Sequence, residues 1–143
     1  MTMTFFGEVY SKDSFDKLRT GSRVGLAHGT YDLFHYGHLR HLKAASDLCE
    51  ILIVSITADR WIKKGPGRPI FDENQRAETL ASLSFVDAVV IVDAPSAVEV
   101  LQWLRPEIYI KGSEYQDTES DPTGAITAEI DVAVKNGGSV LYT

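Results

Sequence analysis

Runs of apolar residues alternate along the chain with segments whose apolar residues recur every three to four positions. The run at residues 50–57 is rich in β-branched residues, as strands buried on both faces of a parallel sheet are. We predict strands at residues 24–27, 50–57, 85–92, 108–110 and 140–142. The amphipathic segments predict helices at residues 12–20, 37–48, 73–84, 96–104 and 125–135.

Capping signals support several of these helix bounds. Asp72 is a suitable N-cap, Pro95 suits the first turn of a helix, and Asn136-Gly137-Gly138 favours a helix end. Alternation of strands with helices predicts an α/β class: a Rossmann-like, doubly wound, five-stranded parallel sheet flanked by helices. Without repeats or linkers, residues 1–143 are expected to form one domain. Because no closing helix follows the last predicted strand, we expect a domain truncated at the C-terminus or a module of a longer protein.

Composition narrows the class of protein. The 143 residues are 44% hydrophobic and 24% charged, as in ordinary soluble domains, and a net charge of −6 argues against a general nucleic-acid binder. No segment reads as a signal peptide or as a membrane span. Cys49 has no second cysteine to pair with. We therefore expect a cytoplasmic protein without nucleic-acid or membrane partners.

Basic residues concentrate locally despite the acidic total. Four lie within nine positions: Arg60, Lys63, Lys64 and Arg68. Gly65-Pro66-Gly67 separates them and favours a flexible flap that could close basic side chains over phosphates. The alternative interpretation is a solvated loop.

The four histidines are also clustered, within fourteen residues: His28, His35, His38 and His41. Even spacing of the last three makes a metal site one alternative. However, helical side chains meet at i and i+3 but turn apart by i+6, and no carboxylate or second cysteine completes a tetrahedral set. We therefore predict no metal ligands from the protein. For His28 and His41 an ordinary core or surface position is a further alternative.

The stretch from His28 to His38 resembles the cytidylyltransferase-like nucleotidyltransferases, whose signature is G-x-F-D-x-x-H-x-G-H. The matching residues are Gly29, Asp32, His35, Gly37 and His38, with Tyr31 in place of the usual Phe. Glycines let the backbone approach a phosphate closely, and the start of a helix attracts an anion. Two imidazoles three residues apart can donate to the same ligand.

Two further blocks are similar to the adenylyltransferase domain of the bacterial ADP-heptose synthase family. The first is Lys64–Ile70 followed by Arg76-Ala77. The second is Arg105–Tyr115, which is similar to the family's R-P-D-x-x-V-K-G-x-D-Y. Together with the histidine motif, the resemblance runs from about Lys12 to Thr143.

The resemblance implies attack by a phosphate oxygen of the acceptor on the α-phosphorus of ATP or CTP, with release of pyrophosphate. The acceptor would be a sugar phosphate similar to heptose 1-phosphate, in the synthesis of lipopolysaccharide or another surface polysaccharide. Mg²⁺ would be carried by the nucleotide phosphates. The implied catalytic residues are His35, His38 and Lys64. The implied nucleotide-binding residues are Gly29, Thr30, Tyr31, Asp32, Gly37, His38, Arg68, Lys111 and Gly112.

Two departures from the family pattern keep alternatives open. His28-Gly29-Thr30-Tyr31-Asp32 replaces the family's Asn-Gly-Cys-Phe-Asp and is closer to cytidylyltransferases for alcohol phosphates. The family's Ser/Thr-rich segment at the triphosphate would lie past Thr143. The acceptor could thus be glycerol 3-phosphate, an amino-alcohol phosphate or a flavin mononucleotide, and a non-catalytic nucleotide-binding module is a second alternative. The family also favours a homodimer.

Overall fold

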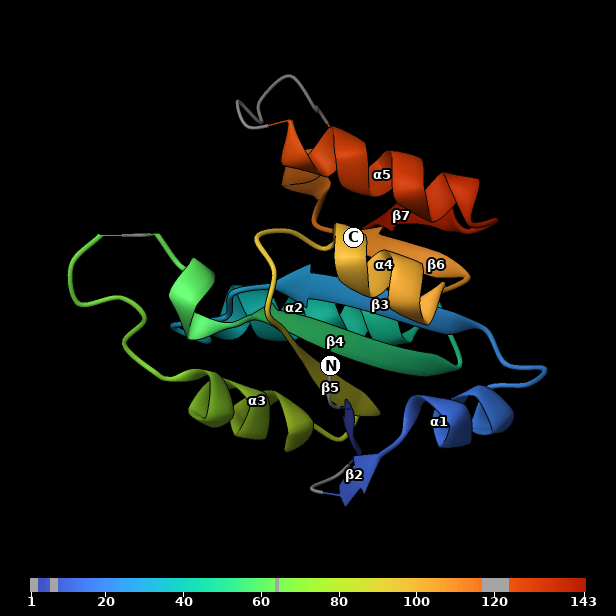
Figure 1. Cartoon of the computed structure of the whole chain (residues 1–143), viewed down its shortest axis with the longest axis horizontal. Helices are drawn as coiled ribbons and strands as arrows, with labels where there is room; N and C mark the ends of the chain where they lie inside the picture. Colours follow the sequence, from blue (N-terminus) through green and yellow to red (C-terminus); the bar gives the residue numbers. More distant parts are fainter. Residues whose placement is uncertain (1–2, 6–7, 64, 117–123) are drawn as a thin grey trace.

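A mixed β-sheet organises the computed structural model, which describes residues 3–5, 8–63, 65–116 and 124–143 (Figure 1). Within these residues the strand order is β2-β1-β5-β4-β3-β6-β7. The strands are β1 (Met3–Phe5), β2 (Glu8–Tyr10), β3 (Val24–Gly29), β4 (Ile51–Thr57), β5 (Ala88–Val92), β6 (Ile108–Lys111) and β7 (Ser139–Tyr142). The helices are α1 (Lys12–Leu18), α2 (Tyr36–Ser46), α3 (Glu73–Ala81), α4 (Val98–Leu104) and α5 (Ala125–Lys135), with short 3-10 turns η1 (Asp59–Trp61) and η2 (Ser113–Tyr115).

The five strands from β3 onward are parallel, as predicted. The chain runs from β3 outward through β4 to β5, then returns to the other side of β3 for β6 and β7. The order therefore reverses between β3 and β6. In sheets of this kind ligands bind beyond the carboxyl ends of the strands at such a switch point. The predicted Rossmann-like α/β class is confirmed.

An N-terminal hairpin that the sequence analysis missed widens the sheet. The strands β1 and β2 pair antiparallel, and Met3 of β1 lies opposite Val90 of β5. The Met3 side chain is 1% exposed and belongs to the core. Strands of three residues are too short to show a period of two in the sequence, which is why they were not predicted. Among the described residues the sheet therefore has two strands more than the five predicted.

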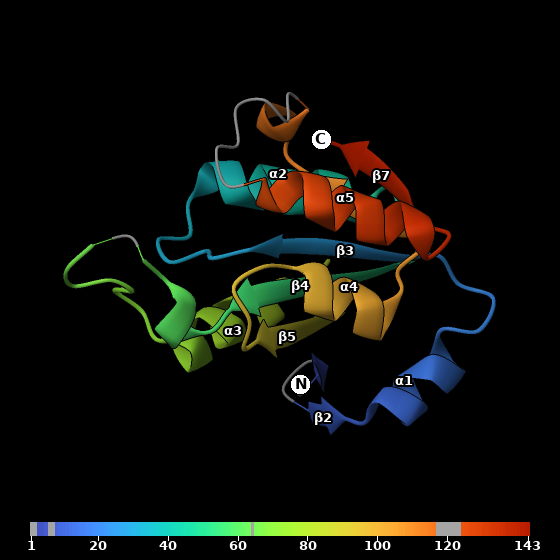
Figure 2. The ribbon, with the colours of Figure 1, turned by 45° about the horizontal axis from the view of Figure 1, so that its top comes forward.

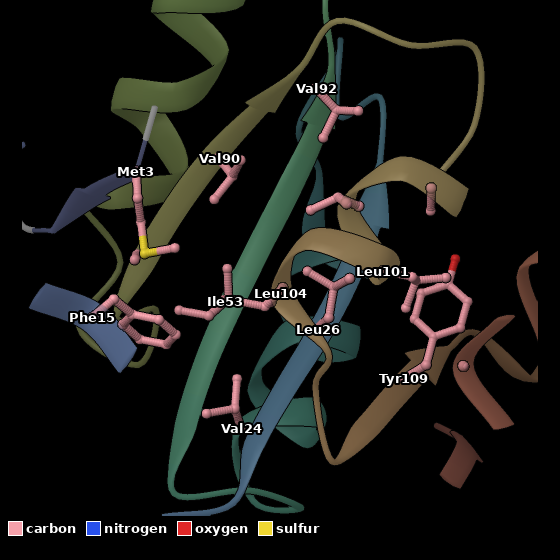
Figure 3. Packing of buried hydrophobic residues seen from close by; sticks show 14 of the residues in the cluster. Met3, Phe15, Val24, Leu26, Ile53, Val90, Val92, Leu101, Leu104 and Tyr109 are labelled. Carbon is pink, nitrogen blue, oxygen red and sulfur yellow. The ribbon is translucent and has the colours of Figure 1, made fainter. Parts of the chain in front are cut away.

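Helices cover both faces of the sheet. On one face α1, α4 and α5 pack on a core that includes Phe15, Leu26, Leu101 and Tyr109 (Figure 3). On the other face α2 and α3 pack on neighbouring strand residues such as Ala27. The alternation of Leu26 and Ala27 between the two cores is the period-two geometry of a strand buried on both faces.

Several element bounds differ from the predicted ones. The helix α4 begins at Val98 with Ala97 as N-cap, so Pro95 precedes the helix and does not lie in its first turn. The helices α2 and α3 end earlier than predicted. By contrast, α5 has the predicted bounds, and Asp72 caps α3 as predicted, with its carboxylate accepting from Gln75 N at 2.8 Å. No helix among the described residues is long and apolar enough to cross a membrane.

Candidate active site

A cleft of about 1070 Å³ opens at the switch point between β3 and β6. Its walls come from the residues after β3, the first turns of α2 and α5, the end of β6 and Arg68 of the loop before α3. The lining includes these predicted site residues: Gly29, Thr30, Tyr31, Asp32, His35, Gly37, His38, Arg68, Lys111 and Gly112. Lys64, the remaining predicted site residue, lies outside the described residues. The structure thus brings into one cleft segments that are more than eighty residues apart in the sequence.

His35 and His38 form a capping box at the start of α2. Nδ1 of His35 accepts from the backbone N–H of Gly37 at 3.0 Å, and Nδ1 of His38 accepts from the backbone N–H of His35 at 3.3 Å. Ser or Thr with Glu or Gln usually fills this motif. Here both capping side chains are imidazoles, and their rings stack with centroids 3.8 Å apart.

This capping arrangement fixes which ring nitrogen carries the proton. A neutral imidazole has one acceptor nitrogen and one donor nitrogen. Because both Nδ1 atoms accept from backbone N–H groups, the proton of each neutral ring is assigned to Nε2. Both rings line the cleft beside the N–H groups of the first helical turn. The arrangement can therefore donate several hydrogen bonds to an anion.

Two glycines make room for aromatic side chains of this loop. A Cβ atom on Gly37 would lie 2.8 Å from Cε1 of His35, and one on Gly29 would lie 2.9 Å from Cε2 of Tyr31. Tyr31 itself has a φ of 52°, the left-handed region that side chains other than glycine rarely adopt. Its buried ring meets the edge of His38 with centroids 5.1 Å apart. Tyr31 thus supports the ring of His38 from inside.

Asp32 anchors the loop that carries Arg68. Its carboxylate accepts from the backbone N–H groups of Ile70 at 2.8 Å and Phe71 at 3.0 Å, and from Nη1 of Arg68 at 3.0 Å. Burial alone would raise the pKa of the Asp32 carboxyl, but the N–H groups of Phe71 and Ile70 and the Arg68 guanidinium outweigh it and hold the pKa at about 2. The predicted flap is therefore tied to the β3 side of the cleft by a carboxylate.

Arg76 is an organising residue that was not among the predicted site residues. Its side chain is 1% exposed. It donates to the carbonyl oxygens of Thr30, Thr57 and Phe71 at 2.9, 2.8 and 3.0 Å, and pairs with Asp59 at 2.7 Å. One guanidinium thus joins the segments that follow β3 and β4 to the loop before α3. Arg76 belongs to the first block that is similar to the ADP-heptose synthase family, but the sequence indicated no role for it.

His28 lies at the floor of the cleft as a neutral ring. Its Nδ1 lies 2.7 Å from Oγ of Ser55, and its Nε2 lies 3.4 Å from Oγ1 of Thr57. Burial, reinforced by the positive charge of Lys111, lowers the pKa of His28 to about 3. The ring is consequently uncharged at neutral pH and offers hydrogen bonds without a positive charge.

Thr143 lies at the cleft beside α2 (Figure 2). Its hydroxyl is 2.5 Å from Nδ1 of His41, its N–H donates to the carbonyl of Lys111, and its carbonyl accepts from Ser113 N. Burial also lowers the pKa of His41, with Glu114 opposing and Lys111 adding to the effect. The end of β7 and the helix α2 are thereby joined across this wall.

The donor groups at the histidine end are those of an anion site. They are imidazole and backbone N–H groups, with a guanidinium nearby. The carboxylate there, Asp32, is engaged by Arg68 and the loop backbone. Among the described residues no group of three or more His, Cys, Asp or Glu side chains gathers in a metal-binding arrangement.

Curated relatives carry the name bifunctional protein HldE. The one from Campylobacter jejuni (strain RM1221) is 35% identical over 120 residues, which cover 81% of this chain and 26% of the relative. The one from Mesorhizobium japonicum is 37% identical over 123 residues, which cover 85% of this chain and 23% of the relative. The chain therefore spans about a quarter of the length of these relatives.

Solved structures share the fold. A lipopolysaccharide core biosynthesis protein from Thermoplasma volcanium matches with a TM-score of 0.67 and 24% identity, over 85% of this chain and 94% of that one. Pantoate-beta-alanine ligase from Francisella tularensis, solved with beta-gamma ATP and beta-alanine, matches with a TM-score of 0.59 and 16% identity, over 93% of this chain and 64% of that one. At these identities the likeness concerns the fold.

The family follows from the sequence matches. Residues 26–137 match the family model described as cytidylyltransferase-like. The resemblance that the motifs indicated, to this family and to its ADP-heptose synthase branch, is confirmed. With most of its length matched by the model and over a third of the aligned residues shared with its relatives, the chain belongs to the cytidylyltransferase-like family of nucleotidyltransferases.

Proposed function

We propose that the protein transfers AMP or CMP from ATP or CTP to a sugar phosphate, with release of pyrophosphate. The observation that carries this proposal is the stacked pair of His35 and His38 at the N-terminus of α2. Both rings have an Nε2 donor and lie in the cleft at the switch point of the sheet. That is where a doubly wound fold binds phosphates.

The reaction joins an acceptor phosphate oxygen to the α-phosphorus while the bond from that phosphorus to the pyrophosphate oxygen breaks. It needs little covalent chemistry from the protein, so positioning and charge stabilisation dominate. The Nε2–H groups of His35 and His38 stabilise the negative charge that grows on the α-phosphate and on the leaving pyrophosphate. Stacking and capping hold both rings in place before substrates bind.

The other cleft residues bind and orient the nucleotide. Gly29 and Gly37 bring the backbone close to the phosphates, and Thr30, Tyr31 and Asp32 shape the pocket that follows β3. Arg68, on the loop that Asp32 anchors, contacts phosphates, and the sequence motif assigns the same task to Lys64. Lys111 and Gly112 contact the nucleotide at the end of β6.

Mg²⁺ enters this proposal as part of the substrate, carried by the nucleotide phosphates. The donor set at the histidine end fits a metal held in this way, because Asp32 is engaged by Arg68 and by the loop backbone. The ion would neutralise charge on the triphosphate. The protein would bind the phosphates of the nucleotide through imidazole, guanidinium and backbone N–H groups.

The acceptor class is inferred from the relatives. The curated relatives are named HldE and one structural neighbour is a lipopolysaccharide core biosynthesis protein. We therefore favour a heptose 1-phosphate or a similar sugar phosphate, used in the cytoplasm to make a precursor of lipopolysaccharide or another surface polysaccharide. The protein acts without nucleic-acid or membrane partners, and a homodimer is its expected assembly.

A substrate matrix tests the proposal. Protein made from the complete open reading frame is incubated with ATP or CTP and, in turn, heptose 1-phosphates, other sugar phosphates and glycerol 3-phosphate. Pyrophosphate release is the readout. We expect turnover with one nucleotide and a sugar phosphate. Turnover with glycerol 3-phosphate alone would reassign the acceptor, and nucleotide binding without turnover on any acceptor would indicate a non-catalytic binding module.

A further inference from the structure

A buried carboxylate on α5, that of Glu129, is among the groups that line the cleft. Glu129 is 5% exposed, and its Oε1 accepts from the Tyr109 hydroxyl at 2.8 Å. Its Oε2 accepts from the N–H of Ala97, the N-cap of α4, at 2.9 Å. Tyr109 and Leu101 of α4 belong to the same buried cluster (Figure 3). Glu129 thus joins β6, α4 and α5.

Lys111 is the cation that faces this carboxylate. Its Nζ lies 4.0 Å from Oε1 of Glu129, and both side chains are under 10% exposed. The ammonium also lies over two aromatic rings, 4.6 Å from the centroid of Tyr115 and 5.4 Å from that of Tyr109. An ammonium taken out of water requires a compensating negative charge, and ring faces supply only part of it.

The two hydrogen bonds of Glu129 do not require a negative charge on its side chain. A neutral amide oxygen could accept from Ala97 N, and an amide NH₂ could donate to the Tyr109 hydroxyl. Of the two groups, the ionised carboxylate carries a charge opposite to that of the Lys111 ammonium, and the amide carries none. The negative charge of Glu129 therefore stabilises the Lys111 ammonium, in addition to the hydrogen bonds that join β6, α4 and α5.

We propose that Glu129 is a positioning residue that holds the Lys111 ammonium at the nucleotide end of the cleft. This inference rests on the proposed function, which assigns Lys111 to nucleotide binding. Glu129 itself does not contact the reacting atoms; it acts through Lys111. Loss of its charge weakens nucleotide binding without moving the histidine pair.

The variant Glu129→Gln tests this by calorimetric titration with ATP and CTP, which requires no turnover. We expect binding of the preferred nucleotide to weaken about ten-fold, as in Lys111→Met. The double variant should bind as weakly as Lys111→Met alone, because Glu129 acts through Lys111. The matched control is Tyr109→Phe, which removes one hydrogen bond to Glu129 but keeps its charge and should keep the wild-type affinity.

Unfolding in urea of the wild type, both single variants and the double variant measures the pair independently of any nucleotide. If the charges are coupled, the double variant loses less stability than the sum of the two single losses. Additive losses would overturn the pairing, and unchanged affinity in Glu129→Gln would overturn the positioning role. If the wild type binds neither ATP nor CTP, the proposed function fails, and with it the role in nucleotide binding. The unfolding cycle then still decides whether the two charges are coupled.

Discussion

The imidazole rings of His35 and His38 stack 3.8 Å apart because each caps the first turn of the same helix. The Nδ1 atoms hold the helix, and the proposed function uses the Nε2 atoms as donors to the phosphates. Structure and proposed chemistry therefore use opposite nitrogens of the same rings. The two roles can be separated by mutation.

The double variant His35→Ser, His38→Gln restores an ordinary capping box while removing both imidazoles. Ser at the N-cap and Gln three residues later make the same two backbone hydrogen bonds. We expect the free energy of unfolding to change by less than about 1 kcal/mol. Turnover should fall by at least about 100-fold, since two donors to the transition state are gone. Urea unfolding and pyrophosphate release measure the two effects.

A matched control for this variant is Lys43→Gln, at an exposed position in the last turn of α2. It should leave turnover unchanged. If the capping-box variant kept wild-type turnover, the histidines would be structural only.

Gly37→Ala should separate ring position from helix stability. Alanine favours a helix over glycine by about 1 kcal/mol, and loss of the His35 cap costs about as much, so the free energy of unfolding should change little. However, the new Cβ would lie 2.8 Å from Cε1 of His35 and must displace that ring. We expect turnover to fall by about ten-fold or more. A variant with full turnover and raised stability would show that the position of the His35 ring does not matter.

Asp32→Asn removes the charge that anchors the loop at Arg68, Ile70 and Phe71. We expect the free energy of unfolding at pH 7 to fall by about 2 kcal/mol, because hydrogen bonds to a charged acceptor are lost. The pKa of Asp32 is lowered from 3.8 to about 2, so its contribution is present above pH 3.8 and is lost as the pH falls toward 2. The difference between wild type and variant should therefore shrink below pH 4.

The control for this loop is Asp93→Asn, which breaks an exposed pair with Arg60. Exposed pairs contribute little to stability, so we expect a much smaller effect at pH 7. Unfolding in urea at several pH values measures both variants. Equal effects of the two substitutions would contradict the anchoring role of Asp32.

His28 should make the protein less stable in mild acid. In the unfolded chain its pKa is near 6.5, whereas in the fold it is about 3, so between these values only the unfolded state binds the proton. Stability then falls as the pH falls from 6.5 toward 3, by up to about 1.4 kcal/mol per pH unit. His28→Gln should reduce the slope of unfolding free energy against pH by up to about 1.4 kcal/mol per pH unit, the contribution of one proton. Equal slopes of unfolding free energy against pH would contradict the buried neutral ring.

The parallel sheet could be predicted from the sequence because β4, β5 and β6 are rich in β-branched residues and are largely buried on both faces. The N-terminal hairpin could not, since three-residue strands carry no measurable alternation. The bounds of α4 were missed by two residues because Pro95 suits a first turn, yet the helix begins only at Val98. Local signals placed the elements better than their ends.

The histidine pair could be predicted because its residues are neighbours in one motif. Glu129 and Arg76 could not, since their roles depend on partners that the fold brings together. Glu129 is 32 residues from Ala97 in the sequence, and Arg76 is 46 residues from Thr30. Arg76 lies on the buried face of α3, four residues before Leu80. An arginine in an apolar stripe is a usable signal for a buried organiser.

Arg76 also affects how much conformational entropy the backbone loses when a ligand binds in the cleft. Because its guanidinium holds the carbonyls of Thr30 and Thr57 together, the backbone at the floor of the cleft is ordered before any ligand arrives. Binding there loses little chain freedom, which favours affinity. By contrast, the Arg68 side chain, on the loop before α3, is 33% exposed and pairs with the Asp32 carboxylate. Adjustment to acceptors of different size is thus expected in that loop, above a rigid floor.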